Sequence, residues 1–258
     1  MSHAEIISAA RRSDQAWCAQ VSRAEPLACG VAYGADAFPS FAEGHQLRDA
    51  WLADEAPEAV FRQVESHYAA RGLTCGLWVP ASGQAPAPVE SLLIGKGWRP
   101  ERRVVLGLEV PSDAAEAPDS SVRVLPARAM PKAYRASLLR ETGGGEDGVR
   151  VGLERLDDPN YDVFLAMVGG APAGRLGYLE VGDVARLTDF SVASAGADRD
   201  VSLALIAHFL RMVRRLLPRT VVACTGSEET ETLAFLESVG FFQVGALPQF
   251  RRPPAPER

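Results

Sequence analysis

Three strand-like segments follow one another between residues 161 and 193, and they leave few folds open to the chain. The segments are YDVFLAMV at 161–168, GRLGYLE at 174–180 and VARLTDFSVA at 184–193. They are joined by GGAPA and VGD, and short glycine-containing connections of this kind are typical of β-hairpins. We therefore predict a three-stranded antiparallel meander in this part of the chain.

Helices and strands alternate after this meander. DVSLALIAHFLRMVRRLL at 200–217 is apolar nearly all round, which predicts a helix buried against a sheet. Asp198 or Asp200 can cap its N-terminus, and arginines near its C-terminus suit the helix dipole. RTVVACT at 219–225 predicts a strand. An amphipathic helix over 228–240, ended by Gly240, and strand-like segments in FFQVGALPQF follow.

A strand and two helices precede the meander. SVRVLPAR at 121–128 alternates as a strand does, KAYRASLLRE predicts a helix, and VGLERL predicts a second, shorter one. TGGGEDG at 142–148, between the two helices, is glycine-rich and acidic. A phosphate-binding loop would present backbone N–H groups without carboxylates beside them, so we interpret this segment as a flexible connection.

The order strand, two helices, meander, helix, strand, helix, strand resembles the GNAT N-acetyltransferase superfamily over residues 121–251. LAFLESVGFF looks like the helix of that superfamily that ends in a Gly-Phe pair. The resemblance implies an α/β (α+β) fold, with a mixed central sheet flanked by helices. PSDAAEAPDSS at 111–121 has the composition of a linker. The predicted organisation is therefore an N-terminal domain at 1–112, a linker at 113–120 and a GNAT-like acyltransferase domain at 121–258.

The N-terminal half looks like a partial second copy of this unit. It predicts a helix at 58–72, a strand at 73–80, a helix at 88–98 and a closing strand at 102–110. Aligning Gly97 with Gly240 also places Leu92 and Leu93 on Phe235 and Leu236, and Trp98 on Phe241. This element-by-element match predicts a tandem GNAT-like fold whose first unit is degenerate.

The resemblance implies a coenzyme A site between the parting strands 184–193 and 219–225. In the superfamily, backbone N–H groups at the N-terminus of the long helix hold the pyrophosphate. The matching residues are Ala197, Asp198, Arg199, Asp200, Val201 and Ser202, and the pantetheine arm would pair with the backbone of Phe190, Ser191 and Val192. Asp200 replaces the first expected glycine. A carboxylate 4 Å from a phosphate costs about 1 kcal/mol in water-like surroundings and about 4 at an effective dielectric near 20. Asp200 would therefore turn outward, or Arg199 would compensate its charge.

Acyl transfer to an amine also needs a group that takes a proton from the amine. Asp189 falls where GNAT enzymes often place an acidic residue, and Glu180 on the preceding strand is a second candidate. Leu236 occupies the position where many of these enzymes carry a tyrosine acid, so solvent would have to protonate the leaving thiolate. Cys224 and His208 lie in apolar segments and are expected to be core residues.

Composition and charge exclude several other classes. The net charge of −6, without a dense Lys/Arg block, argues against nucleic-acid and anionic-membrane partners. The four cysteines are far apart and form no CxxC pair, so neither a metal site nor a disulfide framework is expected. The N-terminus lacks the apolar core of a signal peptide, and no apolar run approaches about 20 residues. We expect a cytoplasmic protein.

Two hypotheses of different classes remain open. In the first, the chain is an N-acyltransferase that uses acetyl-CoA or another acyl-CoA, without a metal, to acylate a small-molecule amine or a peptide; a homodimer is left open. In the second, it is a non-catalytic GNAT-like binding or scaffolding protein that has lost the pyrophosphate loop. Strands that splay beside 190–193 would favour the first. A third reading, an aminoacyl-transfer relative, would need a basic path for tRNA, and the net charge opposes it.

Overall fold

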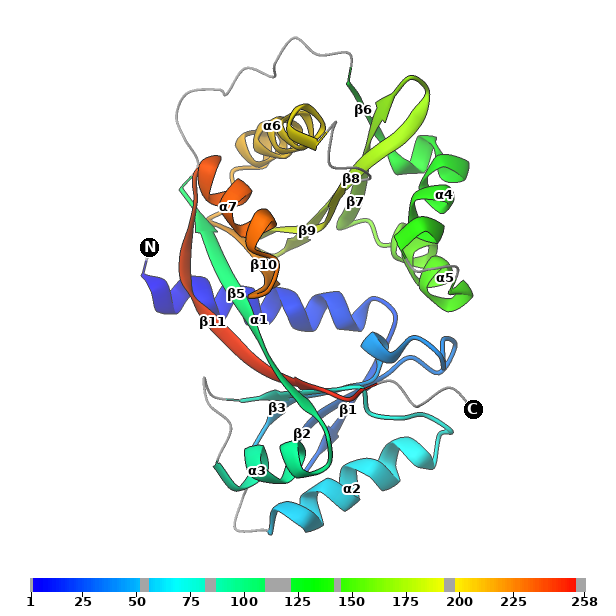
Figure 1. Ribbon diagram of the computed structural model, residues 1–258, viewed down its shortest axis with the longest axis vertical. Helices are drawn as coiled ribbons and strands as arrows, with labels where there is room; N and C mark the ends of the chain where they lie inside the picture. The colour runs from blue at the N-terminus through cyan, green and yellow to red at the C-terminus, as the bar shows by residue number, and fades with distance from the viewer. Residues whose placement is uncertain are drawn as a thin grey trace. The chain divides into compact units, whose positions relative to one another are not determined.

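The computed structural model describes residues 2–51, 56–81, 87–109, 122–141, 145–192 and 198–253. The chain divides into two compact units (Figure 1). Unit 1 comprises Met1–Trp17, Val105–Thr225 and Glu229–Gly245, and unit 2 comprises Cys18–Val104, Gly226–Glu228 and Ala246–Arg258. Each unit therefore takes residues from both halves of the sequence. The predicted linker at 113–120 lies outside the described residues, and the division into 1–112 and 121–258 stays a prediction.

Unit 1 contains the predicted meander and the helices around it. Its elements are α1 (His3–Ala19, as far as Trp17), the end of β5 (Arg99–Leu108), β6 (Arg123–Pro126), η2 (Ala127–Ala129), α4 (Pro131–Glu141), α5 (Glu146–Arg155), β7 (Tyr161–Val168), β8 (Ala171–Val181), β9 (Val184–Val192), α6 (Asp198–Leu216), β10 (Thr220–Gly226), α7 (Thr230–Ser238) and the first part of β11 (Phe241–Arg251). The strand order is β11-β5-β10-β9-β8-β7-β6. The meander is antiparallel and β9 pairs with β10 in parallel, so the predicted mixed sheet is confirmed.

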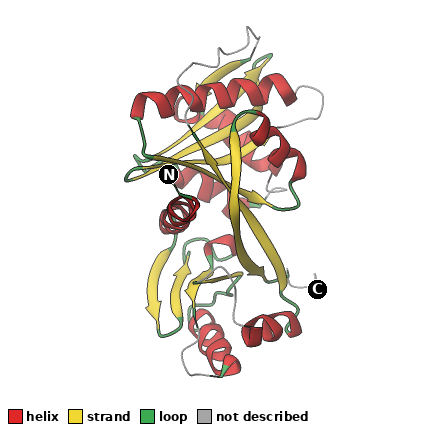
Figure 2. Ribbon diagram, turned by 90° about the vertical axis from the view of Figure 1, so that its left-hand side faces the viewer, coloured by secondary structure: helices red, strands yellow, loops and turns green. Residues whose placement is uncertain are grey.

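Helices cover both faces of the unit 1 strands (Figure 2). Gly174 in β8 lies beneath α6, where a Cβ would be 2.8 Å from Val201. Its neighbour Arg175 donates a hydrogen bond to Ser137 of α4. Because successive strand residues point to opposite faces, α6 and α4 lie on opposite sides of β8. The prediction that the long apolar helix is buried against a sheet is confirmed, since its Phe209 and Leu205 are fully buried.

The element boundaries differ from the prediction in a few places. Helix α5 begins at Glu146, ahead of VGLERL, because Glu146 and Asp147 suit the positive end of the helix dipole. Strand β11 is one continuous strand rather than separate segments. No element is predicted above for residues 3–50, which form α1 and, in unit 2, three strands.

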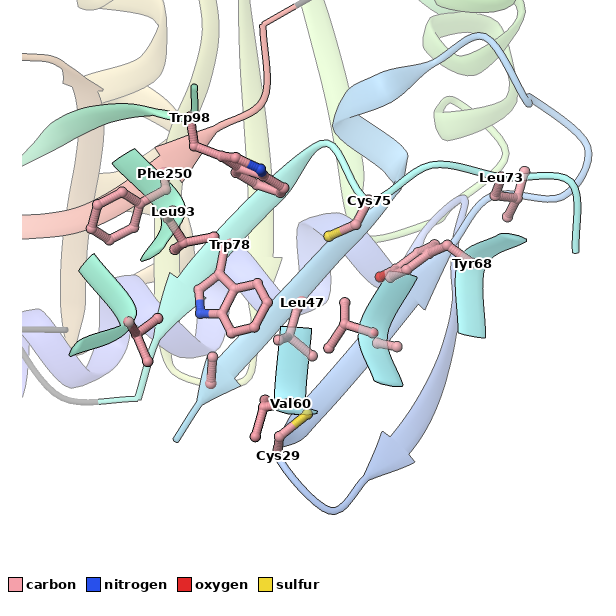
Figure 3. Packing of buried hydrophobic residues seen from close by; sticks show 14 residues of the cluster. Cys29, Leu47, Val60, Tyr68, Leu73, Cys75, Trp78, Leu93, Trp98 and Phe250 are labelled. Carbon is pink, nitrogen blue, oxygen red and sulfur yellow. The ribbon is translucent and has the colours of Figure 1, made fainter. Parts of the chain in front are cut away.

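Unit 2 repeats the plan of unit 1. Its elements are β1 (Arg23–Leu27), β2 (Gly30–Gly34), η1 (Ala42–Gly44), β3 (Gln46–Ala50), α2 (Pro57–Ala69), β4 (Leu77–Pro80), α3 (Ala87–Gly95) and the first part of β5, with the end of β11. The strand order is β1-β2-β3-β4-β11-β5. Its core packs Leu47, Tyr68, Trp78, Trp98 and Phe250 together (Figure 3).

The predicted internal duplication extends over more of the chain than expected. The series β1, β2, β3, α2, β4, α3, β5 repeats β7, β8, β9, α6, β10, α7, β11. Gly97 and Gly240 both have a positive φ after their helices, and the aligned Trp98 and Phe241 are both buried. The duplication therefore includes a first meander, β1–β2–β3, that the sequence pattern does not reveal.

No helix within the described ranges is long and apolar enough to cross a membrane.

Candidate functional site

The strands β9 and β10 part in the middle of unit 1. They pair in parallel from Val184 with Thr220 to Leu187 with Ala223. Both strands continue beyond this last pair, β9 to Val192 and β10 to Gly226. We call residues 188–192 and 224–225 the β9–β10 fork. The β9 side chains are buried before the fork and partly exposed within it. Among the described residues no β9–β10 pair follows Leu187 with Ala223, so the backbone edge of β9 that faces β10 has no strand partner there.

A β-bulge at Asp189 lies where the fork begins. Gly177 pairs with Thr188 and Arg175 with Ser191, so Asp189 and Phe190 together oppose a single β8 residue. Asp189 has a φ of +49°, which is uncommon for a residue with a side chain but occurs more often for aspartate. A bulge bends its strand and redirects side chains. The bulge therefore turns β9 at the point where it leaves β10.

The Asp189 carboxylate is held by a buried tyrosine. The Tyr161 hydroxyl, from the first residue of β7, donates a hydrogen bond to Asp189 Oδ2. Gly177 in β8 lies between the two strands, and a Cβ there would be 3.0 Å from the Tyr161 ring and 2.8 Å from Thr188 Cγ2. The glycine thus leaves the space through which Tyr161 crosses β8 to reach β9.

Two tyrosines remain neutral beside this carboxylate. Burial, together with the Asp189 charge, raises the pKa of Tyr161 well above its ordinary value and also raises the pKa of Tyr134. Both phenols are therefore hydrogen-bond donors throughout the physiological pH range. The Tyr134 hydroxyl is 3.3 Å from the Gly152 carbonyl oxygen that accepts its hydrogen bond. Trp17 of α1 packs edge-on against Tyr161, with 5.2 Å between the ring centroids.

The start of α6 is seated directly against the end of β9. A Cβ on Gly174 would be 2.8 Å from Val201 Cγ1 and 3.0 Å from the Ser191 carbonyl oxygen, so only glycine allows this approach. The first N–H groups of a helix have no acceptor within the helix. In unit 1 such groups therefore lie next to the β9 end of the fork.

A stacked pair of phenylalanines joins the β9 arm of the fork to α7. Phe190 follows the bulge residue on β9, and Phe235 lies on α7, the helix that follows β10. Their ring centroids are 5.6 Å apart and the ring planes differ by 2°. Both side chains are partly exposed.

The structure places the predicted coenzyme A residues as follows. Phe190, Ser191 and Val192 form the fork edge of β9. Arg199 and Asp200 are exposed in the first turn of α6, whereas the side chains of Val201 and Ser202 are buried on the sheet side. Ala197 lies outside the described residues, and so does the side chain of Asp198, the first residue of α6. Any contact that Val201 and Ser202 make with a ligand would therefore come from their backbone.

The two predicted carboxylates are far apart along the strands. Glu180 is exposed and pairs with Ala185, in the part of β9 that is still joined to β10. Asp189 lies at the fork. The structure therefore brings Asp189, but not Glu180, together with residues 190–192 and the start of α6.

The other residues considered in the sequence analysis give no further candidate for catalysis. His208 packs against Phe164 with 4.2 Å between the ring centroids, and burial with the Arg211 charge lowers its pKa. His208 and Cys224 are both partly exposed, so the prediction that they are core residues is wrong. Cys224 is the first β10 residue past the last pair with β9. The Leu236 side chain is buried and has no ionisable group, so it supplies no acid. Within the described residues, no group of three or more His, Cys, Asp or Glu side chains could hold a metal ion.

The sequence interpretation missed Tyr161, Tyr134 and Phe235. The available signal was weak, because Tyr161 is a strand-forming aromatic residue at the start of a predicted strand. Only Gly177, on the neighbouring strand β8, hints that a large side chain crosses there.

Unit 2 contains an equivalent left-handed aspartate, but the two strands beside it stay paired; we call this pairing the closed fork. Asp49 in β3 also has a φ of +49°, and it precedes Ala50 as Asp189 precedes Phe190. However, Ala50 pairs with Pro80, and the Ala81 N–H donates to the Ala50 carbonyl oxygen at 2.9 Å. The strands β3 and β4 therefore stay joined where β9 and β10 part.

The fold of this chain is similar to those of solved GNAT proteins, so the resemblance predicted from the sequence is confirmed at the level of the fold. A GCN5-related N-acetyltransferase from Kribbella flavida is similar over 96% of this chain and 96% of its own, with a TM-score of 0.61 and 13% identity. A tandem GNAT protein from the clavulanic acid biosynthesis pathway matches 89% of this chain and 80% of its own, with a TM-score of 0.51 and 15% identity.

A conserved protein of unknown function from Staphylococcus epidermidis is also similar, with a TM-score of 0.70 and 10% identity over 88% of this chain and 91% of its own. No family model matches the sequence, and no curated protein does. The likeness is thus one of fold, including the tandem arrangement.

Proposed function

We propose that this protein is a GNAT-type N-acyltransferase that transfers an acyl group, acetyl in the simplest case, from acyl-CoA to an amine. The observation that carries the proposal is the open β9–β10 fork, which has the Asp189 bulge at one end and the start of α6 at the other. The acceptor is a small-molecule amine or a peptide amine.

The fork and the helix suit the two ends of coenzyme A. The pyrophosphate would bind the N–H groups at the start of α6, because these groups and the helix dipole favour an anion. Asp200 is exposed, so its carboxylate can point to solvent while Arg199 adds a positive charge. The pantetheine amides would pair with the edge of residues 190–192, as an extended ligand adds to a sheet edge.

Asp189 is the group that would take the proton from the acceptor amine. The Tyr161 hydrogen bond fixes the orientation of the Asp189 carboxylate. Bound acyl-CoA supplies the thioester, whose C–S bond breaks as the amine nitrogen forms the new C–N bond. The amine proton passes to Asp189 directly or through one water, and the thiolate leaving group takes its proton from solvent, because Leu236 offers none.

The test is a calorimetric titration with CoA and acetyl-CoA, followed by acetyl transfer to a panel of amines. Asp189→Asn should bind acetyl-CoA as the wild type does and lose about 10²- to 10⁴-fold in kcat, the usual contribution of a positioned proton acceptor. Asparagine tolerates the left-handed backbone, so the bulge should survive. Asp49→Asn is the matched control in the closed fork and should leave turnover unchanged.

Equal kcat values for the two asparagine variants would show that Asp189 has no catalytic role. Failure of the wild-type protein to bind CoA at millimolar concentration would refute the acyltransferase proposal.

A second candidate, a GNAT-like protein that binds without catalysis, is favoured by two residues. Asp200 occupies a position where glycine is expected, and Leu236 replaces the usual acid. This candidate predicts CoA binding without transfer to any amine in the panel, or no binding at all.

A further inference from the structure

The fork contains an aromatic contact that the transfer chemistry does not use. Beyond the last β9–β10 pair, Phe190 of β9 stacks on Phe235 of α7, the helix that follows β10. The contact therefore joins the β9 arm of the fork to α7, where pairing between β9 and β10 has stopped.

The two rings are too close together to admit an alkyl chain between them. Parallel offset rings with centroids 4.5–7 Å apart are in van der Waals contact, and the observed 5.6 Å lies within this range. A methylene chain needs about 3.5–4 Å to carbon atoms on each of its sides. A chain that extends into this part of the fork has to displace one of the rings.

The proposed position of the donor brings its acyl end to this pair. With the pyrophosphate at α6 and the pantetheine arm along Val192, Ser191 and Phe190, the thioester lies next to Asp189 and Phe190. The acyl substituent then extends from the thioester toward Phe190 and Phe235.

The closed fork of unit 2 lacks the aromatic pair. Ala50 stands at the position of Phe190, and Leu92 at that of Phe235. Because the two units repeat the same elements, stacked phenylalanines are not needed to build this part of the fold. The stacked phenylalanines lie beside the open fork and have no counterpart beside the closed one, which points to a role in ligand selection.

We infer that Phe190 and Phe235 restrict the donor to short acyl groups, acetyl or propionyl, by closing the fork to longer chains. This inference rests on the proposed function, and it identifies Phe235 as a specificity-determining residue.

The experiment compares binding of CoA, acetyl-CoA and octanoyl-CoA to the wild-type protein, Phe235→Ala and Leu92→Ala by calorimetry. The wild type should bind octanoyl-CoA at least tenfold more weakly than acetyl-CoA. Phe235→Ala should improve octanoyl-CoA binding more than tenfold, since each newly buried methylene contributes about fourfold in affinity. Its affinity for free CoA should stay within about twofold of the wild type, and Leu92→Ala should behave as the wild type does.

The controls separate the inference from the proposed function. CoA binding with the same octanoyl-to-acetyl ratio in wild type and Phe235→Ala overturns the inference alone. Absence of CoA binding to the wild type overturns the proposed function and the inference with it. If thermal melting shows that Phe235→Ala does not fold, Phe190→Leu takes its place with the same expected change in the ratio.

Discussion

Asp189 combines an uncommon backbone conformation with a carboxylate whose position is set from another strand. Its φ of +49° orients the side chain, and Tyr161 fixes one carboxylate oxygen. Left-handed residues with side chains cost of order 1–3 kcal/mol and occur most often at functional sites. The equivalent Asp49 has the same φ beside a closed fork, so the bulge alone does not create the site.

At the residue scale, we predict that Tyr161→Phe lowers the kcat of acyl transfer by about 10- to 10²-fold. Burial raises the pKa of Tyr161 well above its ordinary value, so its hydroxyl donates to Asp189 at every working pH. Without this donor the Asp189 carboxylate is no longer held in one orientation, and a misplaced proton acceptor slows the transfer. The measurement is kcat and KM with the best acceptor from the amine panel.

The matched control for this change is Tyr68→Phe in unit 2. The Tyr68 hydroxyl is also buried and donates to the Tyr33 and Gln46 carbonyl oxygens. Both variants should lose about 1 kcal/mol of stability for a buried hydrogen bond, but only Tyr161→Phe should lower kcat. A loss of kcat of the same size in Tyr68→Phe would show that the rate reports stability rather than the site.

At the scale of elements, the first turn of α6 links the sheet to the proposed anion site. Gly174 lets this turn approach the Ser191 carbonyl, and Val201 and Ser202 anchor it on the sheet. Arg199 and Asp200 are thereby left on the exposed side. The same helix carries Arg214 and Arg215 in its last turn, where cations suit the dipole.

We predict that two charge reversals on α6 have opposite effects on stability and unequal effects on binding. Arg199→Glu places a negative charge at the helix N-terminus and should stabilise the fold by about 0.3–1 kcal/mol, while it weakens CoA binding about tenfold or more. Arg215→Glu should destabilise the fold by a similar amount and leave CoA affinity unchanged. Thermal melting and calorimetry measure the two quantities. Equal CoA affinities for the two variants would place the pyrophosphate away from α6.

Local patterns predicted the elements of unit 1 well, because its strands alternate or run apolar and its helices have clear apolar faces. Residues 23–27, RAEPL, were not predicted as a strand, since their polar composition and proline hide it. The Tyr161–Asp189 contact could not be predicted, because it depends on a bulge that shifts the register of β9 by one residue. The candidate site was predicted from the sequence only through the order of elements.

At the scale of the whole molecule, the two units share their closing strands. Strand β11 of the second repeat pairs with β4, through Phe250 with Trp78, and β5 of the first repeat neighbours β10. Each unit thus depends on a strand from the other repeat. No local pattern predicts this exchange, because it joins segments more than 100 residues apart. The duplication has nevertheless produced two unequal forks on one plan.

This inequality predicts the number of ligands that one chain binds. Calorimetry with CoA should give one site per chain, because the Ala50–Pro80 pairing and the Ala81 hydrogen bond occupy the edge of β3 that the pantetheine arm would need. Saturation at 100 times the dissociation constant should stabilise the protein by about 2.7 kcal/mol, the value for a single site. Arg199→Glu should lower the affinity without changing the stoichiometry. A titration that saturates at two CoA per chain would show that the first fork opens in solution, and the duplication would then have preserved two sites rather than one.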